Sequence, residues 1–161
     1  MEKVVLRKMK NYEYNNWMEL SIKRQAEDRA YVNNTLALDE ELGLYDIVKH
    51  LLPGGKETFN HHFYSIDYLD DKNCGFVWFG VIPGLPDDQI FIMDIFVDNF
   101  FRKKGIGKQA LILSHKMMKD LGYKFSVLNV LKENKAKKLY ESLGYNVIED
   151  EIKSVVMLKE L

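Results

Sequence analysis

The sequence predicts an α/β layered protein built on a mixed, mostly antiparallel central sheet of about six or seven strands, flanked by about four helices. Runs of β-type residues alternate with runs of helical periodicity in the order β-α-α-β-β-β-α-β-α-β-β. The chain has 161 residues, of which 47% are hydrophobic, as in folded domains. No repeat or linker-like segment interrupts it. We therefore expect residues 1–161 to form a single domain.

The first half is predicted to contain a short strand, two helices and two paired strands. Asn11 has a side chain typical of a helix cap, and Pro53-Gly54-Gly55 is expected to end the second helix. Residues 70–73 are rich in Asp and Asn and predict the turn of a hairpin. The expected elements are a strand over 4–9, a helix from 12 into the low thirties, a helix over 39–52, and strands over 61–68 and 74–82.

The second half is predicted to alternate strands with two helices. A loop over 83–88 precedes a nearly all-apolar strand. Apolar residues at helical spacing predict one helix that ends at Gly122 and a shorter one that ends at Gly144. The expected elements are a strand over 90–97, a helix through 110–121, a strand over 125–130, a helix over 136–143, and strands over 145–148 and 152–158.

Charge is distributed unevenly along the chain. Residues 102–138 carry eleven Lys or Arg and two acidic residues, a net charge of +9, whereas the other 124 residues carry −10. Such segregation indicates an anion-binding surface on an acidic body. The alternative is a solvated, lysine-rich helical face.

Cysteine content and hydropathy indicate the compartment. Cys74 is the single cysteine, so it has no partner for an internal disulfide. The sequence shows neither the apolar segment of an export signal nor an apolar run long enough for a membrane helix. We expect a cytoplasmic protein without a membrane partner.

A basic, glycine-containing turn follows the strand over 90–97 and opens the next helix. The unpaired N–H groups at the start of a helix, together with its dipole, bind phosphate. Glycines allow the backbone to approach the anion closely, and basic side chains add charge-assisted contacts. The expected anion-binding residues are Arg102, Lys103, Lys104, Gly105, Ile106, Gly107 and Lys108.

A dinucleotide site is a weaker interpretation of this turn. Residues 105–110 satisfy the pattern G-x-G-x-x-G/A. However, seven residues separate the strand from the first glycine, and the chain after Gly105 is too short for the second half of that fold. The context therefore argues against a nicotinamide or flavin dinucleotide.

Two motifs resemble a known family. Val97 followed by Arg102-x-x-Gly105-x-Gly107 is similar to the acyl-CoA pyrophosphate loop of the GNAT superfamily of N-acetyltransferases. The second signature of that family resembles residues 128–145, with Leu128-Asn129-Val130, Asn134, Leu139-Tyr140-Glu141 and Gly144-Tyr145. The resemblance implies a GNAT-like fold and acetyl-CoA (coenzyme A) as co-substrate. It further implies transfer of an acetyl (acyl) group to a primary amine of a small molecule, peptide or protein, by direct attack in a ternary complex. We expect no metal, because the adjacent His61 and His62 would point to opposite faces of a strand and the other histidines show no ligand spacing.

The resemblance also implies roles for particular residues. Two central strands are expected to splay at a bulge, so that the backbone of Ile95, Phe96 and Val97 hydrogen-bonds the pantetheine amides. The N–H groups of residues 103–108 would hold the pyrophosphate. Asn134 stands one residue away from the usual spacing, which leaves open whether it contacts coenzyme A or caps the helix.

Tyr140 matches the tyrosine that protonates or hydrogen-bonds the leaving thiolate in many members of the family. A tyrosine of reference pKa about 10 is a weak acid toward a thiol of about 8.5, so hydrogen bonding is at least as plausible as proton transfer. The alternative is a core tyrosine on the apolar stripe of its helix.

The sequence leaves the identity of the general base open. Some relatives carry a glutamate where this strand has Asn129, and an amide is no base. Asp94 is the acid inside the apolar strand, and alternation is expected to place it on the face shared with Ile92 and Phe96. A carboxylate there would be partly desolvated, as suits a base. The alternatives are a structural aspartate or a water chain.

Other functions remain open at this stage. The fold could bind acyl-CoA as a sensor without transfer, or the basic residues 102–138 could bind nucleic acid. The negative net charge and the lack of aromatic residues among those lysines argue against nucleic acid. The acidic remainder of the chain favours a cationic amine acceptor. Dimers are common among relatives, so a homodimer is compatible with the resemblance.

Overall fold

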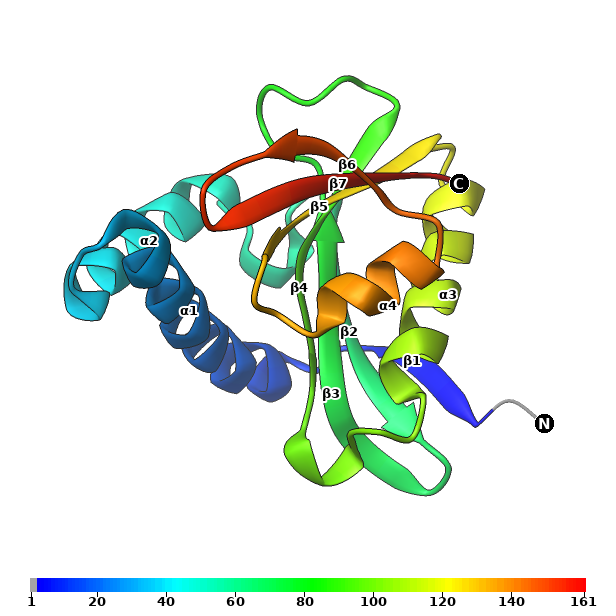
Figure 1. The fold of residues 1–161 in the computed structure, drawn as a ribbon. Coiled ribbons are helices and arrows are strands. Elements are labelled where there is room, and N and C mark those ends of the chain that lie inside the picture. The colour runs from blue at the N-terminus through cyan, green and yellow to red at the C-terminus, as the bar shows by residue number, and fades with distance from the viewer. Residues whose placement is uncertain (1–2) are drawn as a thin grey trace. The chain divides into compact units, whose positions relative to one another are not determined.

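The computed structural model describes residues 3–161, and the elements follow the predicted order (Figure 1). Two single turns of 3-10 helix, η1 (Gly55–Glu57) and η2 (Asn99–Phe101), accompany them. The strands and α-helices are β1 (Val4–Lys8), α1 (Asn11–Asn33), α2 (Ala37–Leu51), β2 (His61–Tyr68), β3 (Asp71–Gly80), β4 (Gln89–Val97), α3 (Ile106–Asp120), β5 (Phe125–Leu131), α4 (Ala136–Ser142), β6 (Asn146–Asp150) and β7 (Ser154–Glu160).

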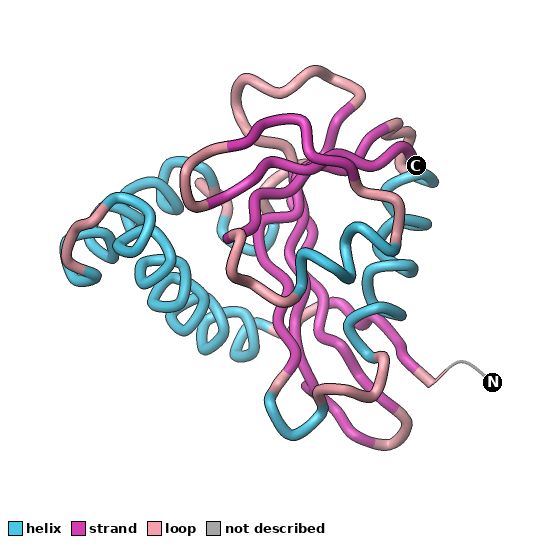
Figure 2. The backbone as a smooth tube through the Cα atoms, in the orientation of Figure 1, coloured by secondary structure: helices cyan, strands magenta, loops and turns pink. Residues whose placement is uncertain are grey.

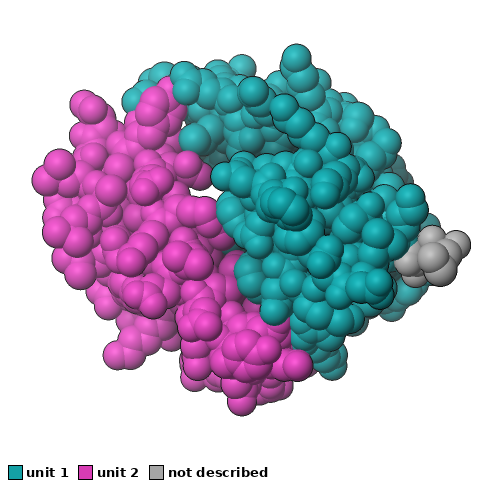
Figure 3. Space-filling model, turned by 90° about the horizontal axis from the view of Figure 1, so that it is seen from below, with its two compact units in different colours: residues 1–8, 62–161 teal, residues 9–61 magenta. Residues whose placement is uncertain are grey.

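The chain divides into two compact units (Figure 3). Met9–His61 form one unit, which contains α1 and α2. The other unit combines the described N-terminal residues up to Lys8 with the segment from His62 to the C-terminus. All residues that the sequence predicts for the cofactor and the chemistry lie in the latter unit, which is unit 1 in Figure 3.

One sheet contains all seven strands of residues 3–161, in the order β1-β2-β3-β4-β5-β7-β6 (Figure 2). Strand pairs β1–β2, β3–β4, β5–β7 and β6–β7 are antiparallel, whereas β4–β5 is parallel. The predicted mixed, mostly antiparallel sheet is confirmed. The β4–β5 pair lies at the centre of this order. It is parallel because the chain passes from β4 to β5 through the crossover helix α3.

Helices α3 and α4 pack on one face of the sheet. Leu111 and Met118 of α3 join Tyr140 of α4 in a core cluster with buried strand residues. The strand residues of this cluster are Val77, Phe79, Ile90, Ile92, Leu128, Val130, Val155 and Met157. This apolar layer anchors the middle and end of α3, and α4 through Tyr140, to the central strands.

Helices α1 and α2 pack against each other within their own unit. The N-cap of α1 is Lys10 rather than the predicted Asn11. The reason is that Glu13 Oε1 accepts a hydrogen bond from the Lys10 N–H at 2.9 Å, so the helix begins one residue earlier. Across residues 3–161, no helix combines the length and the hydropathy needed to cross a bilayer.

The hairpin between β2 and β3 is tighter than predicted. Strand β3 begins at Asp71 rather than 74, so residues 71–73 pair instead of turning. Asn73 has a φ of 59° and donates its N–H to Asp67 Oδ1 at 3.0 Å. The aspartate thus holds Asn73 in the left-handed region, which asparagine tolerates, and the strand starts earlier.

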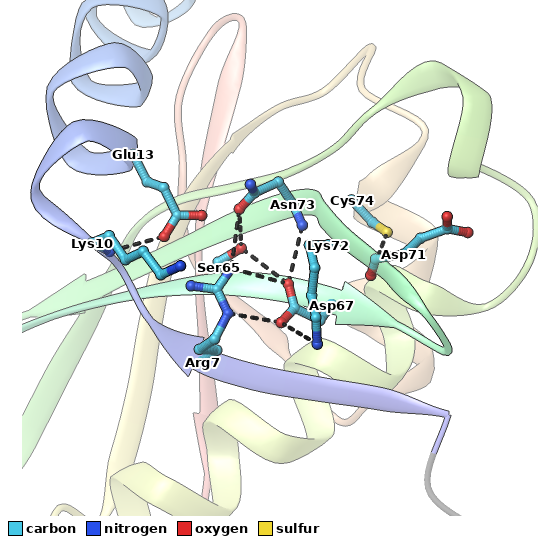
Figure 4. A network of polar contacts seen from close by, with 9 residues as sticks. All are labelled: Arg7, Lys10, Glu13, Ser65, Asp67, Asp71, Lys72, Asn73 and Cys74. Carbon is cyan, nitrogen blue, oxygen red and sulfur yellow. Dashed lines mark hydrogen bonds and ion pairs between the residues drawn. The ribbon is translucent and has the colours of Figure 1, made fainter.

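Asp67 is the centre of a polar network on β1, β2 and β3 (Figure 4). Arg7 Nε donates to Asp67 Oδ2 at 2.8 Å, and Lys72 Nζ lies 3.6 Å from the same oxygen. Burial alone raises the pKa of Asp67, but the hydrogen bonds of Arg7 and Asn73 and the charges of Arg7 and Lys72 outweigh it and hold the pKa below its usual value. Only 3% of the Asp67 side chain is exposed, so the network stabilises the fold only while the carboxylate is paired.

We predict that Arg7→Met lowers the free energy of unfolding by about 2–3 kcal/mol at pH 7, because it leaves a buried carboxylate without its main partner. Stability from a depressed aspartate pKa is lost as pH falls through that pKa, so the deficit should shrink in acid. Urea unfolding at neutral and acid pH measures both effects. Lys72→Met is the control, because Lys72 is 65% exposed and should cost less than about 1 kcal/mol. An equal deficit at both pH values would contradict the prediction.

Candidate active site

The central strands β4 and β5 part within the sheet. Their parallel ladder joins Gln89 to Phe125, Ile90 to Ser126 and Phe91 to Val127. Beyond Phe91, in the part of the chain that the structure describes, β4 is paired with β3 but not with β5. The backbone of residues 92–97 therefore has one edge available to an added strand-like partner. The expected splay, which contains Ile95, Phe96 and Val97, is present.

A β-bulge lies at the start of this open segment. Trp78 of β3 is opposite Asp94, but its neighbour Phe79 is opposite Ile92, so Met93 is the extra residue. Trp78 and Phe79 point to opposite faces of the sheet, and so do their partners. The prediction that Asp94 shares a face with Ile92 is therefore wrong. The shared face with Phe96 is confirmed, because regular pairing resumes after the bulge.

Gly75 of β3 allows the two strands to approach closely beside the site. A Cβ on Gly75 would overlap the carbonyl oxygen of Phe96 and lie 3.0 Å from Val97 Cα. Any other residue would therefore displace the β4 segment whose edge is open. No local sequence pattern marks this glycine, since only the pairing register reveals its neighbour.

The loop before α3 presents a row of backbone donors. Among residues 3–161, no acceptor pairs with the N–H groups of residues 103–108; the first bond of the helix is Gln109 N–H to Gly105 C=O. Gly105 is the N-cap of α3 with a φ of 77°, a conformation that favours glycine. No atom lies within 4 Å of where its Cβ would be, and a Cβ on Gly107 would meet only Val97 Cγ2 at 3.8 Å. The donors, the helix dipole and the open space fit a phosphate group.

Arg102 connects this loop to the end of β4. Its Nε donates to the Val97 carbonyl at 2.7 Å, and its guanidinium lies over the Phe96 ring at 5.1 Å. Lys104 Nζ lies over Phe100 and Phe101, at 5.2 and 5.6 Å from the ring centroids. The Arg102 bond ties the loop to the end of β4, which holds the open strand edge and the donor row together.

Tyr140 lies on α4 in the core cluster, with 7% of the residue exposed. Its hydroxyl makes no hydrogen bond to any group in residues 3–161. Burial, and secondly the negative charge of Asp94, raise the pKa of Tyr140 to about 12. The structure thus brings Asp94 and Tyr140 into electrostatic contact although they come from distant parts of the sequence.

Asn134 hydrogen-bonds the first turn of α4. Its Oδ1 accepts a hydrogen bond from the Ala136 N–H at 2.9 Å, but the N-cap residue of the helix is Lys135, so Asn134 satisfies a donor of the first turn from the position before the cap. Among the nearby lysines, Lys137 forms an ion pair with Glu141 at 2.6 Å. Whether Asn134 or these lysines touch a cofactor remains a prediction.

A buried polar cluster behind Tyr140 was missed at the level of sequence. The Tyr145 hydroxyl lies 2.6 Å from His115 Nε2 and 2.8 Å from Ser126 Oγ. Burial, and secondly Lys159, lower the pKa of His115 to about 4, so the ring is neutral at pH 7. His115 and Ser126 carried no sequence signal, because their partner is distant in the chain. In residues 3–161, no three His, Cys, Asp or Glu side chains are grouped to hold a metal ion.

This combination of fold and site defines an acetyltransferase. Residues 20–145 match the acetyltransferase (GNAT) family, and the chain belongs to that family as an N-acetyltransferase. It is 30% identical over 159 residues to the uncharacterized N-acetyltransferase YycN of Bacillus subtilis, covering 98% of this chain and 99% of that protein.

Solved structures share the fold. A crystal structure of Bacillus subtilis YycN has a TM-score of 0.83 and 28% identity, covering 93% of this chain and 96% of the other. The PaiA N-acetyltransferase of Thermoplasma acidophilum, crystallised in complex with coenzyme A, has a TM-score of 0.64 at 18% identity, covering 99% and 100% of the two chains. The latter likeness concerns the fold.

We predict that Gly75→Ala destabilises the protein by about 1–3 kcal/mol, because the new methyl group forces β3 and β4 apart. The affinity for coenzyme A should fall as well, since the displaced backbone includes the open edge. Thermal unfolding and calorimetric titration with coenzyme A measure the two effects. Gly43→Ala is the matched control, because a Cβ there has no neighbour within 4 Å. Unchanged stability and affinity in Gly75→Ala would show that the strands tolerate the methyl group.

Proposed function

We propose that the protein transfers an acetyl group from acetyl-CoA to a primary amine by direct attack in a ternary complex. The observation that carries the proposal is the juxtaposition of the open β4 edge with the unpaired N–H groups of residues 103–108, tied together by Arg102. The open edge suits the amide-bearing pantetheine arm, and the donor row suits the pyrophosphate. Acetyl-CoA contains both groups in one molecule.

The binding contacts follow from this arrangement. The backbone of Ile95, Phe96 and Val97 pairs with the pantetheine, while Lys103 to Lys108 surround the pyrophosphate. The Val97 carbonyl already accepts one bond from Arg102, so its N–H and the groups of Ile95 are the more available ones. A backbone N–H near Val97 is also in place to stabilise the oxyanion.

The reaction forms a nitrogen–carbon bond and breaks the carbon–sulfur bond of the thioester. Asp94, or a water beside it, takes the proton that the amine loses. Tyr140 donates a hydrogen bond to the departing thiolate. With a pKa of about 12, full proton transfer from Tyr140 to a thiolate of pKa about 8.5 is strongly uphill, whereas hydrogen bonding has no such cost. When Asp94 accepts a proton it also loses the charge that opposes ionisation of Tyr140.

The acceptor that we propose is a cationic amine on a small molecule, peptide or protein. Residues 9–61 carry nine acidic and six basic residues, and acidic side chains attract a protonated amine to the surface. We further propose a cytoplasmic location, because Cys74 is a free thiol.

Ligand-dependent stability and coenzyme A release test the proposal. Acetyl-CoA and CoA at about 100 times the dissociation constant should each stabilise the protein by about 2.7 kcal/mol, a shift of several degrees in Tm. NAD serves as the negative control. A panel of amines should then release CoA from acetyl-CoA. Binding without release across the panel would favour an acyl-CoA sensor, and no shift with either CoA species would overturn the proposal.

We predict that Tyr140→Phe lowers kcat by about 10²-fold and leaves the dissociation constant of CoA within about twofold, because the hydroxyl interacts with a charge that develops during reaction. Steady-state kinetics and calorimetric titration separate the two effects. Tyr123→Phe is the matched control, because Tyr123 packs against the same core cluster. An unchanged kcat in Tyr140→Phe would remove this tyrosine from the chemistry.

We predict that Asp94→Asn reduces the rate most at low pH, where the amine arrives protonated and needs a base. The deficit should shrink as pH rises, because a neutral amine attacks without help. The pH profile of kcat/KM for wild type and variant is the measurement. A variant profile parallel to that of wild type would show that Asp94 is not the base.

A further inference from the structure

The buried hydroxyl of Tyr145 is held from two sides. His115 Nε2 lies at 2.6 Å and Ser126 Oγ at 2.8 Å, and all three residues are buried. Because His115 is neutral at pH 7, its Nε2 either accepts a hydrogen bond or donates one, according to the tautomer. In the first case Tyr145 donates to His115 and accepts from Ser126, and in the second both bonds run the other way, so the Tyr145 hydroxyl makes two hydrogen bonds in either case. Two hydrogen bonds of this kind in a buried site hold a ring in one orientation.

The three residues come from separate elements of the site. His115 lies on α3, the helix that begins at the donor loop. Ser126 lies on β5, opposite Ile90, within the last three positions before β4 and β5 part. Tyr145 follows α4. The cluster therefore connects three elements: helix α3, strand β5 where it still pairs with β4, and the end of α4.

Tyr145 is coupled to Tyr140 by backbone and by ring. The Tyr145 N–H donates to the Tyr140 carbonyl at 3.1 Å, and the Gly144 N–H donates to the Glu141 carbonyl at 3.1 Å. With Gly144 at a φ of 97°, these bonds form a Schellman motif at the end of α4. The two tyrosine rings meet edge to face, with centroids 5.7 Å apart and planes at 66°.

We propose that His115, Tyr145 and Ser126 form a positioning cluster that orients the Tyr140 hydroxyl toward the thiolate of coenzyme A. This inference rests on the proposed function, in which Tyr140 donates a hydrogen bond to the leaving group. The Tyr140 hydroxyl has no partner of its own within residues 3–161, so its direction depends on the packing of its ring. The Tyr145 ring packs directly against the Tyr140 ring. The orientation of the Tyr145 ring depends in turn on its hydrogen bonds with His115 and Ser126. His115, Tyr145 and Ser126 are positioning residues, because they act through Tyr140.

The test measures the pKa of the CoA thiol in the bound state, which requires no knowledge of the acceptor. A hydrogen bond to the thiolate lowers this pKa. The probe is CoA, titrated by the ultraviolet absorbance of its thiolate, with desulfo-CoA as the blank that removes the adenine absorbance. Wild type should lower the thiol pKa by about one unit relative to free CoA, which corresponds to about 1.4 kcal/mol.

Four variants separate the roles. Tyr140→Phe should return the thiol pKa to the value of free CoA, and Tyr145→Phe should return at least half of the difference. The double variant should match Tyr140→Phe alone, because Tyr145 acts only through Tyr140. Ser126→Ala removes one of the two hydrogen bonds and gives a milder version of the Tyr145→Phe effect. Tyr123→Phe, from the same core cluster, is the control and should match wild type.

The outcomes distinguish the two proposals. One outcome is that Tyr140→Phe returns the thiol pKa to that of free CoA, while folded Tyr145→Phe and Ser126→Ala keep the wild-type value. This outcome would overturn the positioning cluster and leave the role of Tyr140 intact. A wild-type value in Tyr140→Phe would overturn the role of Tyr140, and the cluster with it. His115→Gln, which retains a side-chain hydrogen-bonding group, should preserve more of the thiol shift than His115→Leu. Equal loss in both would also contradict the proposal.

Discussion

The parting of β4 and β5 is the constraint on which the rest of the site depends. A regular parallel pair hydrogen-bonds its backbone groups along its whole length. Here the ladder stops after Phe91 and Val127, and the bulge at Met93 follows two residues later in β4. The open segment remains ordered because its other edge pairs with β3, at a distance that only Gly75 allows. Arg102 then ties the end of that segment to the loop before α3. Edge, loop and helix are therefore connected into one continuous surface, which we propose as the cofactor site.

Main-chain groups dominate this surface. The open edge of residues 92–97 and the N–H groups of residues 103–108 are backbone, so in the function that we propose they would recognise a ligand by its amides and phosphates. The basic side chains have a more mixed role: Arg102 braces the loop, Lys104 lies over two phenylalanine rings and Lys137 is paired with Glu141. The segregated positive charge thus sets a favourable potential around a site whose geometry is set by the backbone.

The two side chains that we propose for the chemistry are brought together by packing between distant segments. Asp94 comes from β4 and Tyr140 from α4, and the charge of the first acts on the second. In the same core, the Tyr145 hydroxyl forms hydrogen bonds with His115 and Ser126. The resemblance of residues 128–145 to the second family signature predicted a role for Tyr140. Local patterns carried no information about the hydrogen bonds among His115, Ser126 and Tyr145, because these bonds join segments that only folding brings together.

The sequence by itself determined the order of strands and helices, the loop with its glycines and basic residues, and the place of Tyr140, because periodicity, helix termination and a short motif are local properties. Only the tertiary structure decided on which face Asp94 lies, since one extra residue in a strand reverses the alternation. It also decided that Lys10 caps α1, that β3 begins at Asp71, and that Gly75 must lack a side chain. Each of these features follows from a hydrogen bond, a strand register or a close approach between chain segments. The residue pattern along a single segment does not contain that information.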